Sequence, residues 1–500
     1  MDEHDSTAIA STTAGAVRGS IDRGVLTFTG VPYAAPPVGA LRFRPPQPVE
    51  PWDGVRDALE LAPSCPQPTE RPPGWPQEHS IDEDCLYLNV WTPALADGGA
   101  RPVMVWIHGG GYAIGSGSWP LYDGANLARR GDVVSISVNH RLGPFGYLHL
   151  GGLADGHMDD DEAASSGNNG MLDLVATLEW VRDNAAAFGG DPGNVTIMGE
   201  SGGGAKVTTL LAMPAARGLF HRAAIQSGPG LRATSPERAT SAARELAAAL
   251  GATDDPSRLW SASAEEILTA ASGTSAGRMG FSPVLDGRAI PAHPGDALAR
   301  GEAADVPVIV GCNRDEAAGS LPSELDDAAL RSRLARTPGI DGDEVIEEVV
   351  GSYRAAHPDA TDVDLLSFAL TDQRMRAGSI QLAEAKSKGS STPVWQYFFT
   401  YEMGGRAGHG YEIAFMLDNL DIGGTPASAP RQRLADAMSE AWIAFARSGD
   451  PNHAGLADWP PFTVPERSTM ILGRDACEAV DDPSRPTREL WERIAAARRR

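Results

Sequence analysis

The segment around Ser201 constrains the fold of this chain more strongly than any other part of the sequence. Residues 195–198 form a short apolar run rich in β-branched side chains, which predicts a strand buried on both faces of a sheet. Gly199-Glu200-Ser201-Gly202-Gly203 follows at once, and residues 205–213 have a helical pattern. A Gly-x-Ser-x-Gly sequence between a strand and a helix is typical of a nucleophile elbow, a tight turn that exposes its serine. Ser201 is therefore the candidate nucleophile.

The Gly-x-Ser-x-Gly pattern alone is not specific, because Gly273-Thr274-Ser275-Ala276-Gly277 also matches it. This second copy follows a helical pattern at residues 264–271 instead of a strand, and residues 279–283 after it cannot begin a helix. We therefore predict that residues 273–277 form a loop, which leaves Ser201 as the nucleophile.

Strand and helix patterns alternate along most of the chain. Apolar runs predict strands at residues 16–20, 25–30, 86–91, 102–107, 133–138, 223–228, 306–311 and 394–401. Helical patterns cover residues 168–188, much of 231–300 and 323–388, and segments that begin near residues 435 and 487. This alternation predicts an α/β fold in which a mostly parallel sheet is covered by helices on both faces, with long helical and loop insertions. No linker or repeat divides the 500 residues, so we expect a single domain, 1–500.

The net charge indicates which partners the chain can bind, and the N-terminus and cysteine content indicate the compartment in which it works. The net charge of −24 would repel nucleic acid and anionic membranes. No basic segment precedes an apolar stretch at the N-terminus, and no apolar run approaches about 18 residues, so we expect a cytoplasmic protein without a membrane span. Four cysteines do not form a disulfide framework in a chain this long. Cys65 and Cys85 could pair, but we expect reduced thiols in a cytoplasm.

A serine nucleophile needs a base, an acid that orients the base, and donors for the oxyanion. Three histidines follow the predicted strand at residues 306–311. His357 precedes a proline in a helical region, and His453 follows an exposed turn. Only His409 lies in a glycine-flanked loop shortly after a predicted strand, so it is the candidate base.

The acid and the oxyanion donors are sought in the loops that follow strands. Asp315 and Glu316 both follow the strand at residues 306–311, and spacing alone cannot choose between them. His108-Gly109-Gly110-Gly111 follows the strand at residues 102–107, as the corresponding motif of esterases does. The backbone N–H groups of Gly110, Gly111 and Gly202 are therefore the candidate oxyanion hole.

Several segments together resemble the type-B carboxylesterases, the family of bacterial p-nitrobenzyl esterases, animal carboxylesterases and cholinesterases. The segments that carry the resemblance lie at residues 30–37, 83–89, 106–112, 139–143, 188–192, 199–203 and 409–412, and thus extend over nearly the whole chain. The resemblance implies an α/β-hydrolase fold and a serine carboxylesterase, EC 3.1.1 type, that cleaves small-molecule esters through an acyl-enzyme. It implies no metal and no organic cofactor.

The resemblance also assigns roles to individual residues. The acid of the family is usually the glutamate of an Asp-Glu-Gly segment, which selects Glu316, although Ala317 replaces the glycine here. Similarity places Glu200 beside the nucleophile and Ser227 near the histidine as supporting polar groups. Secreted relatives join the cysteines that match Cys65 and Cys85.

Three other functions use or keep the same framework. Some bacterial relatives cleave aryl carbamates or amides with this machinery. Adhesion proteins of the family keep the fold without catalysis, but they lack the nucleophile or base and are membrane-tethered. A lipase that acts at oil surfaces is disfavoured because no strongly apolar lid segment stands out. The preferred ester and the oligomeric state are not predicted.

Overall fold

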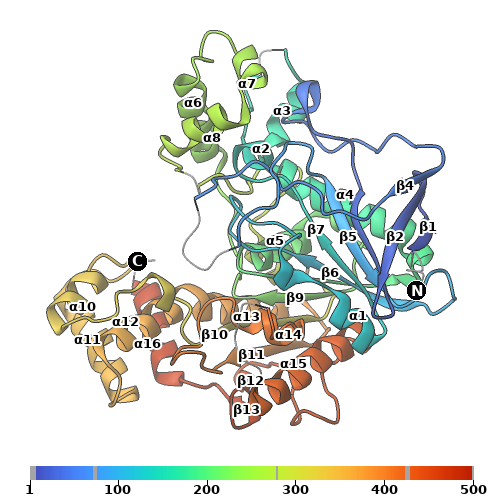
Figure 1. Ribbon diagram of the computed structural model, residues 1–500. Helices are drawn as coiled ribbons and strands as arrows, with labels where there is room; N and C mark the ends of the chain where they lie inside the picture. Colours follow the sequence, from blue (N-terminus) through green and yellow to red (C-terminus); the bar gives the residue numbers. More distant parts are fainter. Residues whose placement is uncertain (1–6, 71–75, 155, 278–279, 423–427, 498–500) are drawn as a thin grey trace.

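The computed structural model describes residues 7–70, 76–154, 156–277, 280–422 and 428–497 (Figure 1). The strands are β1 (Thr7–Ser11), β2 (Ala16–Asp22), β3 (Val25–Pro32), β4 (Val55–Asp57), β5 (Tyr87–Thr92), β6 (Arg101–Ile107), β7 (Val134–Val138), β8 (Gly190–Glu200), β9 (Arg222–Gln226), β10 (Val308–Asn313), β11 (Val394–Phe399), β12 (Ser468–Leu472) and β13 (Cys477–Asp481).

Helices connect most of these strands. A π-helical turn, η7 (Asp372–Arg376), joins two consecutive helices, α12 and α13. The α-helices are α1 (Ala125–Gly131), α2 (Gly143–Tyr147), α3 (Asp160–Ser165), α4 (Asn169–Asn184), α5 (Gly202–Ala212), α6 (Pro236–Ala249), α7 (Ser257–Ser261), α8 (Ala264–Ser272), α9 (Pro294–Ala299), α10 (Asp327–Leu334), α11 (Asp343–Ala356), α12 (Asp362–Thr371), α13 (Ala377–Gly389), α14 (Glu412–Met416), α15 (Ala429–Ser448) and α16 (Arg485–Ala497).

The strands form one sheet in the order β1-β2-β3-β5-β7-β6-β8-β9-β10-β11-β12-β13, with β4 beside β2. From β7 to β12 all neighbours are parallel, whereas the pairs outside this range are antiparallel except for β4, which is parallel to β2. Gly199 at the end of β8 is paired with Ile107 of β6 on one side and Ile225 of β9 on the other. The carboxyl ends of three parallel strands therefore meet at the elbow, the edge at which open α/β sheets bind ligands.

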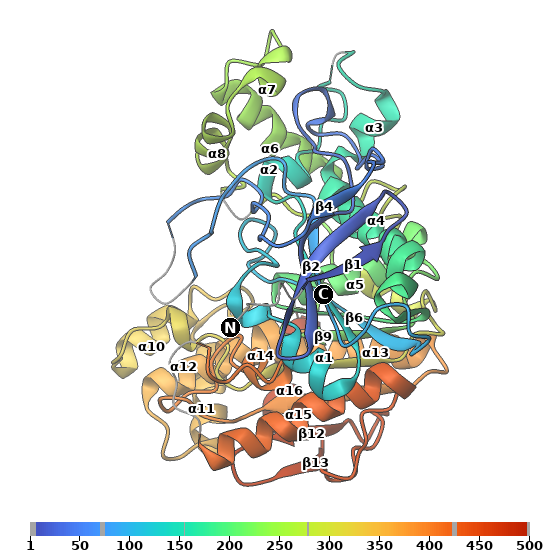
Figure 2. The ribbon, with the colours of Figure 1, turned by 45° about the vertical axis from the view of Figure 1, so that its right-hand side comes forward.

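Helices bury both faces of the parallel strands. All seven residues of β6 are buried, and residues 103–107 alternate between two hydrophobic clusters. Val103 and Val105 lie in the cluster that includes side chains of α4 and α5, while Trp106 lies in the cluster that includes Trp442 of α15. The long helix α15 lies along this second face of the sheet (Figure 2). The predicted mostly parallel sheet with helices on both faces is confirmed.

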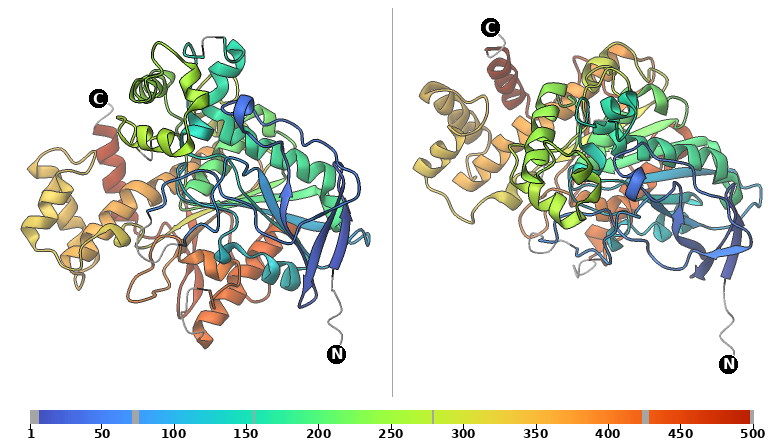
Figure 3. Two further views of the ribbon diagram at one scale, coloured as in Figure 1. Left: turned by 45° about the horizontal axis from the view of Figure 1, so that its top comes forward. Right: turned by 90° about the horizontal axis from the view of Figure 1, so that it is seen from above.

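Two groups of helices project from this sheet, as the predicted insertions (Figure 3). One group contains α6, α7 and α8; the other contains α10, α11, α12 and α16 and has a separate hydrophobic cluster that includes Leu366 and Trp491. The strand patterns did not reveal β1, β4, β12 or β13, and α15 begins at Ala429, earlier than residue 435. Among the helices of the described ranges, none combines the length and apolar character needed to cross a membrane.

Candidate active site

Ser201 occupies the turn between β8 and α5. Its backbone has φ 56° and ψ −120°, a strained conformation for a non-glycine residue. The Ser201 N–H donates to Gln226 O of β9 at 2.8 Å, and Ser201 O accepts from Ala205 N at 3.0 Å. The side chain is half-buried, and within the described part of the chain its Oγ makes no hydrogen bond. Because the turn is anchored by its backbone, the hydroxyl is left available to a substrate.

His409 and Glu316 meet at the same edge of the sheet. Glu316 follows β10, and His409 lies in the loop after β11. His409 Nδ1 and Glu316 Oε2 are 2.5 Å apart. The other oxygen, Glu316 Oε1, accepts hydrogen bonds from Ser227 Oγ and Asn313 N, each at 2.6 Å. The Glu316 side chain is only 2% exposed. Both oxygens are thus held, so the carboxylate can orient the imidazole ring.

Asp315 faces a different set of partners. Its Oδ2 pairs with Arg314 at 2.8 Å and accepts from the backbone N–H of Ala407 at 2.7 Å. The side chain is fully buried in these contacts. The structure therefore brings Glu316, and not Asp315, to His409.

Glu200 lies on the other side of the imidazole ring. Its Oε1 is 3.3 Å from His409 Nε2, and its side chain is 6% exposed. Burial raises the pKa of Glu200, and the nearby charges of Glu412 and Glu316 raise it further against the opposing effect of His409. Burial lowers the pKa of His409, but the charges of Glu200 and Glu316 outweigh burial, so the net shift is upward. The carboxylates therefore favour the imidazolium form.

The glycine loop after β6 lies against the elbow. Gly110 and Gly111 have φ of 85° and 64°, values that glycine adopts without strain. A Cβ on Gly202 would lie 2.1 Å from Gly111 O, so the two backbones touch. The N–H groups of Gly110, Gly111 and Gly202 donate no hydrogen bond to any other described residue. Three unpartnered donors beside one serine can bind an oxyanion.

Comparison with known proteins gives one consistent result. A model of the carboxylesterase family matches residues 6–491. The para-nitrobenzyl esterase of Bacillus subtilis strain 168 is 35% identical over 499 residues, covering 97% of this chain and 98% of that protein. Phenmedipham hydrolase of Pseudarthrobacter oxydans is 36% identical, covering 96% and 97%. A solved Geobacillus stearothermophilus carboxylesterase has a TM-score of 0.85 at 38% identity, covering 97% and 99%. The chain belongs to the carboxylesterase family.

Family membership confirms the predicted reaction class and fold. The protein is a serine carboxylesterase, a carboxylic ester hydrolase with the α/β-hydrolase fold. Among the described residues of this carboxylesterase, no group of three or more histidine, cysteine, aspartate or glutamate side chains is placed to hold a metal ion. Cys65 and Cys85 are buried free thiols, and Cys65 Sγ accepts a hydrogen bond from Leu142 N at 3.1 Å.

Two buried ionisable residues of this carboxylesterase were not selected from the sequence. Glu412 accepts a hydrogen bond from Asn313 Nδ2 at 2.5 Å, and burial raises its pKa. It lies three residues after His409, a spacing that could have marked it. Lys206 of α5 is fully buried directly below the glycine loop. A lysine within the otherwise uncharged helix that follows a candidate nucleophile could have marked this position.

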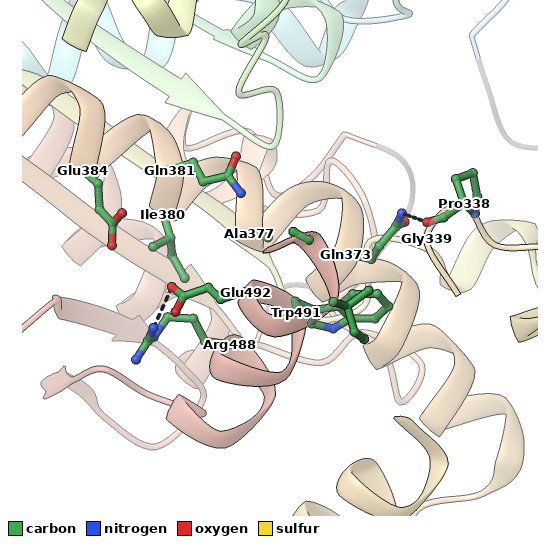
Figure 4. Close-up of a pocket in the computed structure, with 12 residues that line it drawn as sticks. Pro338, Gly339, Gln373, Ala377, Ile380, Gln381, Glu384, Arg488, Trp491 and Glu492 are labelled. Carbon is green, nitrogen blue, oxygen red and sulfur yellow. Dashed lines mark hydrogen bonds and ion pairs between the residues drawn. The ribbon is translucent and has the colours of Figure 1, made fainter. Parts of the chain in front are cut away.

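A separate cavity of about 180 Å³ lies between α13 and α16 (Figure 4). Figure 4 shows Arg488 paired with Glu492 at one end and Gln373 bonded to Pro338 O at the other. None of the described residues that line this cavity is a serine, cysteine or histidine. It therefore offers no nucleophile or base for ester hydrolysis.

Proposed function

We propose that this carboxylesterase works through an acyl-enzyme on Ser201, with His409 as the base and Glu316 as the acid that orients it. Ser201 Oγ attacks the ester carbonyl carbon while His409 Nε2 takes the hydroxyl proton. The tetrahedral intermediate then expels the alcohol, which takes that proton from His409. Water attacks the acyl-enzyme by the same route and releases the acid. The observation that carries the proposal is that His409 contacts both Glu316, at 2.5 Å, and Glu200, the residue before the strained, unbonded Ser201.

The proposal assigns the oxyanion to the N–H groups of Gly110, Gly111 and Gly202. Their lack of other partners supports this role, because an occupied donor could not stabilise developing charge. Ser227 supports the acid through its hydrogen bond to Glu316. The charge of Glu200, 3.3 Å from His409 Nε2, supports the base by stabilising the imidazolium that forms once the proton is taken. No metal or organic cofactor takes part in these steps.

Rapid mixing with a p-nitrophenyl ester tests the acyl-enzyme. We expect a burst of one p-nitrophenolate per enzyme molecule, and acid quenching should leave the acyl group on the peptide that contains Ser201. An acyl group on any other residue would refute the assignment. A panel of p-nitrophenyl esters of rising chain length, with one aryl carbamate and one anilide, then ranks ester hydrolysis against carbamate and amide hydrolysis. A chain without turnover of any of these would fit the non-catalytic adhesion class instead.

We further infer that residues 1–500 act as a single domain that resides in the cytoplasm and takes a small-molecule ester as its partner, not nucleic acid or a membrane. One continuous sheet from Thr7 to Asp481 supports the single domain. The net charge of −24 disfavours anionic partners, and four free thiols support a reducing compartment. Alkylation of protein from its own cells, unfolded in denaturant so that the buried thiols can react, should modify all four cysteines. A disulfide between Cys65 and Cys85 would contradict the location.

A further inference from the structure

A fully buried lysine lies beneath the glycine loop. Lys206 is in the second turn of α5, the helix that begins directly after Ser201. Its Nζ donates hydrogen bonds to Gly111 O at 2.8 Å and to His108 O at 3.2 Å. The same ammonium group lies 5.3 Å from the centre of the Tyr112 ring. No acidic side chain of the described residues forms an ion pair with it. Its partners are thus the two ends of the glycine loop.

Between these ends, the carbonyl oxygens of Gly109 and Gly110 each contact a nitrogen of a neighbouring residue. Gly109 O is 2.9 Å from His108 Nδ1, and Gly110 O accepts from Ile114 N at 3.2 Å. In a trans peptide the carbonyl and the following N–H point in opposite directions. These contacts therefore turn the N–H groups of Gly110 and Gly111 away from the rest of the loop, and Lys206 holds the carbonyls on either side.

The three candidate oxyanion donors come from two different segments. Gly202 donates from the first turn of α5, whereas Gly110 and Gly111 donate from the loop after β6. A productive oxyanion hole needs its donors held within about 0.5 Å of their working positions. The Lys206 side chain is a direct polar link from α5 to that loop, since it starts on the helix and ends on the loop carbonyls.

We propose that Lys206 is a positioning residue for the oxyanion hole, which ties the glycine loop to the helix of the nucleophile. The inference rests on the proposed function, because it assumes that the oxyanion forms beside Ser201. Burial lowers the pKa of Lys206 to about 7. A neutral amine still has two N–H groups, which is enough for the two carbonyls, so the link does not depend on the charge of the lysine.

Lys206→Met tests the proposal, because methionine keeps an unbranched apolar stem and removes both hydrogen bonds. Lys386→Met is the matched control. Lys386 is also fully buried, and its Nζ bonds Ala303 O at 2.8 Å and Ser390 Oγ at 2.7 Å. Ala303 precedes β10, so this lysine supports the amino ends of the strands, away from Ser201. Both variants lose buried hydrogen bonds, but only one loses a link to the oxyanion loop.

Rates are measured per active site, counted by complete reaction with an organophosphate. We expect Lys206→Met to lower kcat by about 10- to 100-fold, less than the loss of one whole oxyanion donor, and to leave KM within about 3-fold. Binding of a trifluoromethyl ketone, which forms a tetrahedral adduct, should weaken by the same factor as kcat/KM. Lys386→Met should keep all three quantities within about 2-fold of wild type while its Tm falls.

Equal kcat per active site in the two variants would overturn the proposal, as would a loss of kcat without weaker ketone binding. If Lys206→Met does not fold, Lys206→Arg and Lys386→Arg replace the pair. The longer guanidinium then displaces the loop, and unchanged kcat in Lys206→Arg overturns the proposal. Failure of the proposed function is distinct, because the organophosphate would then label a residue other than Ser201 in the wild-type protein.

Discussion

The two Gly-x-Ser-x-Gly segments of this chain have the same pattern and opposite surroundings. Ser201 follows a central strand, has positive φ, and its hydroxyl is unbonded within the described chain. Ser275 follows helix α8 and is exposed. Its Oγ donates to Glu245 Oε1 at 2.8 Å, and its backbone N–H donates to Glu245 Oε2. Ser201 lies at the sheet edge that also holds His409, whereas Ser275 is hydrogen-bonded to a surface carboxylate.

The comparison teaches that the strand before the motif matters more than the motif itself. Because Ser201 follows the end of β8, it lies at the carboxyl edge of the sheet, where the loops after β6, β10 and β11 also begin. A helix end on the surface gathers no such neighbours. The proposed acid, base and oxyanion donors therefore lie at the same edge as Ser201, because parallel strands share one edge.

The largest expected effect separates the two serines directly. Ser201→Ala should lower kcat by roughly 10⁴- to 10⁶-fold, because the nucleophile and base act as a unit. Ser275→Ala should leave kcat unchanged, since the Ser275 side chain hydrogen-bonds the Glu245 carboxylate and no described histidine. Initial rates on p-nitrophenyl acetate measure both variants. A Ser201→Ala enzyme with more than a few per cent of wild-type activity would move the nucleophile elsewhere.

Neighbouring carboxylates offer a second pair of the same kind. Glu316→Gln keeps the shape but loses the charge that orients His409, so kcat should fall by roughly 10³- to 10⁴-fold. Asp315→Asn breaks a buried ion pair with Arg314 instead. We expect a lower Tm and less than about a 10-fold loss of kcat per folded molecule, because Asp315 does not contact the base. The reverse order of the two kcat losses would assign the acid to Asp315.

The pH dependence of activity should respond to Glu200, the carboxylate beside Ser201, and not to Glu245, the carboxylate beside Ser275. His409 must be neutral to accept a proton, and its pKa is raised above 6.5 despite burial, because Glu200 and Glu316 are close. Activity should therefore fall as pH drops through that raised pKa, with the midpoint of kcat/KM above 6.5. Glu200→Gln removes one of these charges and should lower the midpoint. Glu245→Gln, next to Ser275, should not move it. Profiles of kcat/KM from pH 5 to 10 decide; equal midpoints in wild type and Glu200→Gln contradict the electrostatic account.

The sequence predicted most of the sheet, because central parallel strands are continuous apolar runs such as Val103 to Ile107. The sequence patterns did not predict strands β12 and β13. Strand β13 is half-exposed, and its residues do not form an apolar run. The residues that meet at the site could be proposed singly because each follows a strand or a glycine. Their contacts could not, since the approach of Glu200 to His409 depends on how the loop after β11 folds back over the end of β8.

Spacing also could not choose between Asp315 and Glu316. The choice depends on the path of the chain after β10, where Asp315 turns towards Arg314 and Glu316 towards Ser227. Similarity to the family selects Glu316, and the contact of Glu316 with His409 agrees with that choice. The hydrogen bonds of Lys206 could not be predicted by either route, because a buried lysine in a helix gives no sign of which carbonyls it bonds.

The smallest expected effect concerns the first glycine of each copy. A Cβ on Gly199 would lie 2.6 Å from both Ile107 O and Gly203 C, so backbone must move to admit a side chain. A Cβ on Gly273 would meet only Ala270 O, at 3.6 Å, and Gly273 has φ −87° and ψ −7°, which alanine adopts freely. Gly273 is also the C-terminal cap residue of α8, where its N–H already bonds Ala270 O.

Gly273→Ala should therefore leave kcat unchanged and alter the free energy of unfolding by no more than about 1 kcal/mol, in the stabilising direction, because alanine restricts the unfolded chain. Thermal unfolding and ester hydrolysis of the same preparation measure both. A fall in Tm of several degrees would mean that the second copy needs its glycine for a close backbone approach, as the first does. The difference between the copies would then lie in the preceding strand alone, and not in the packing of their glycines.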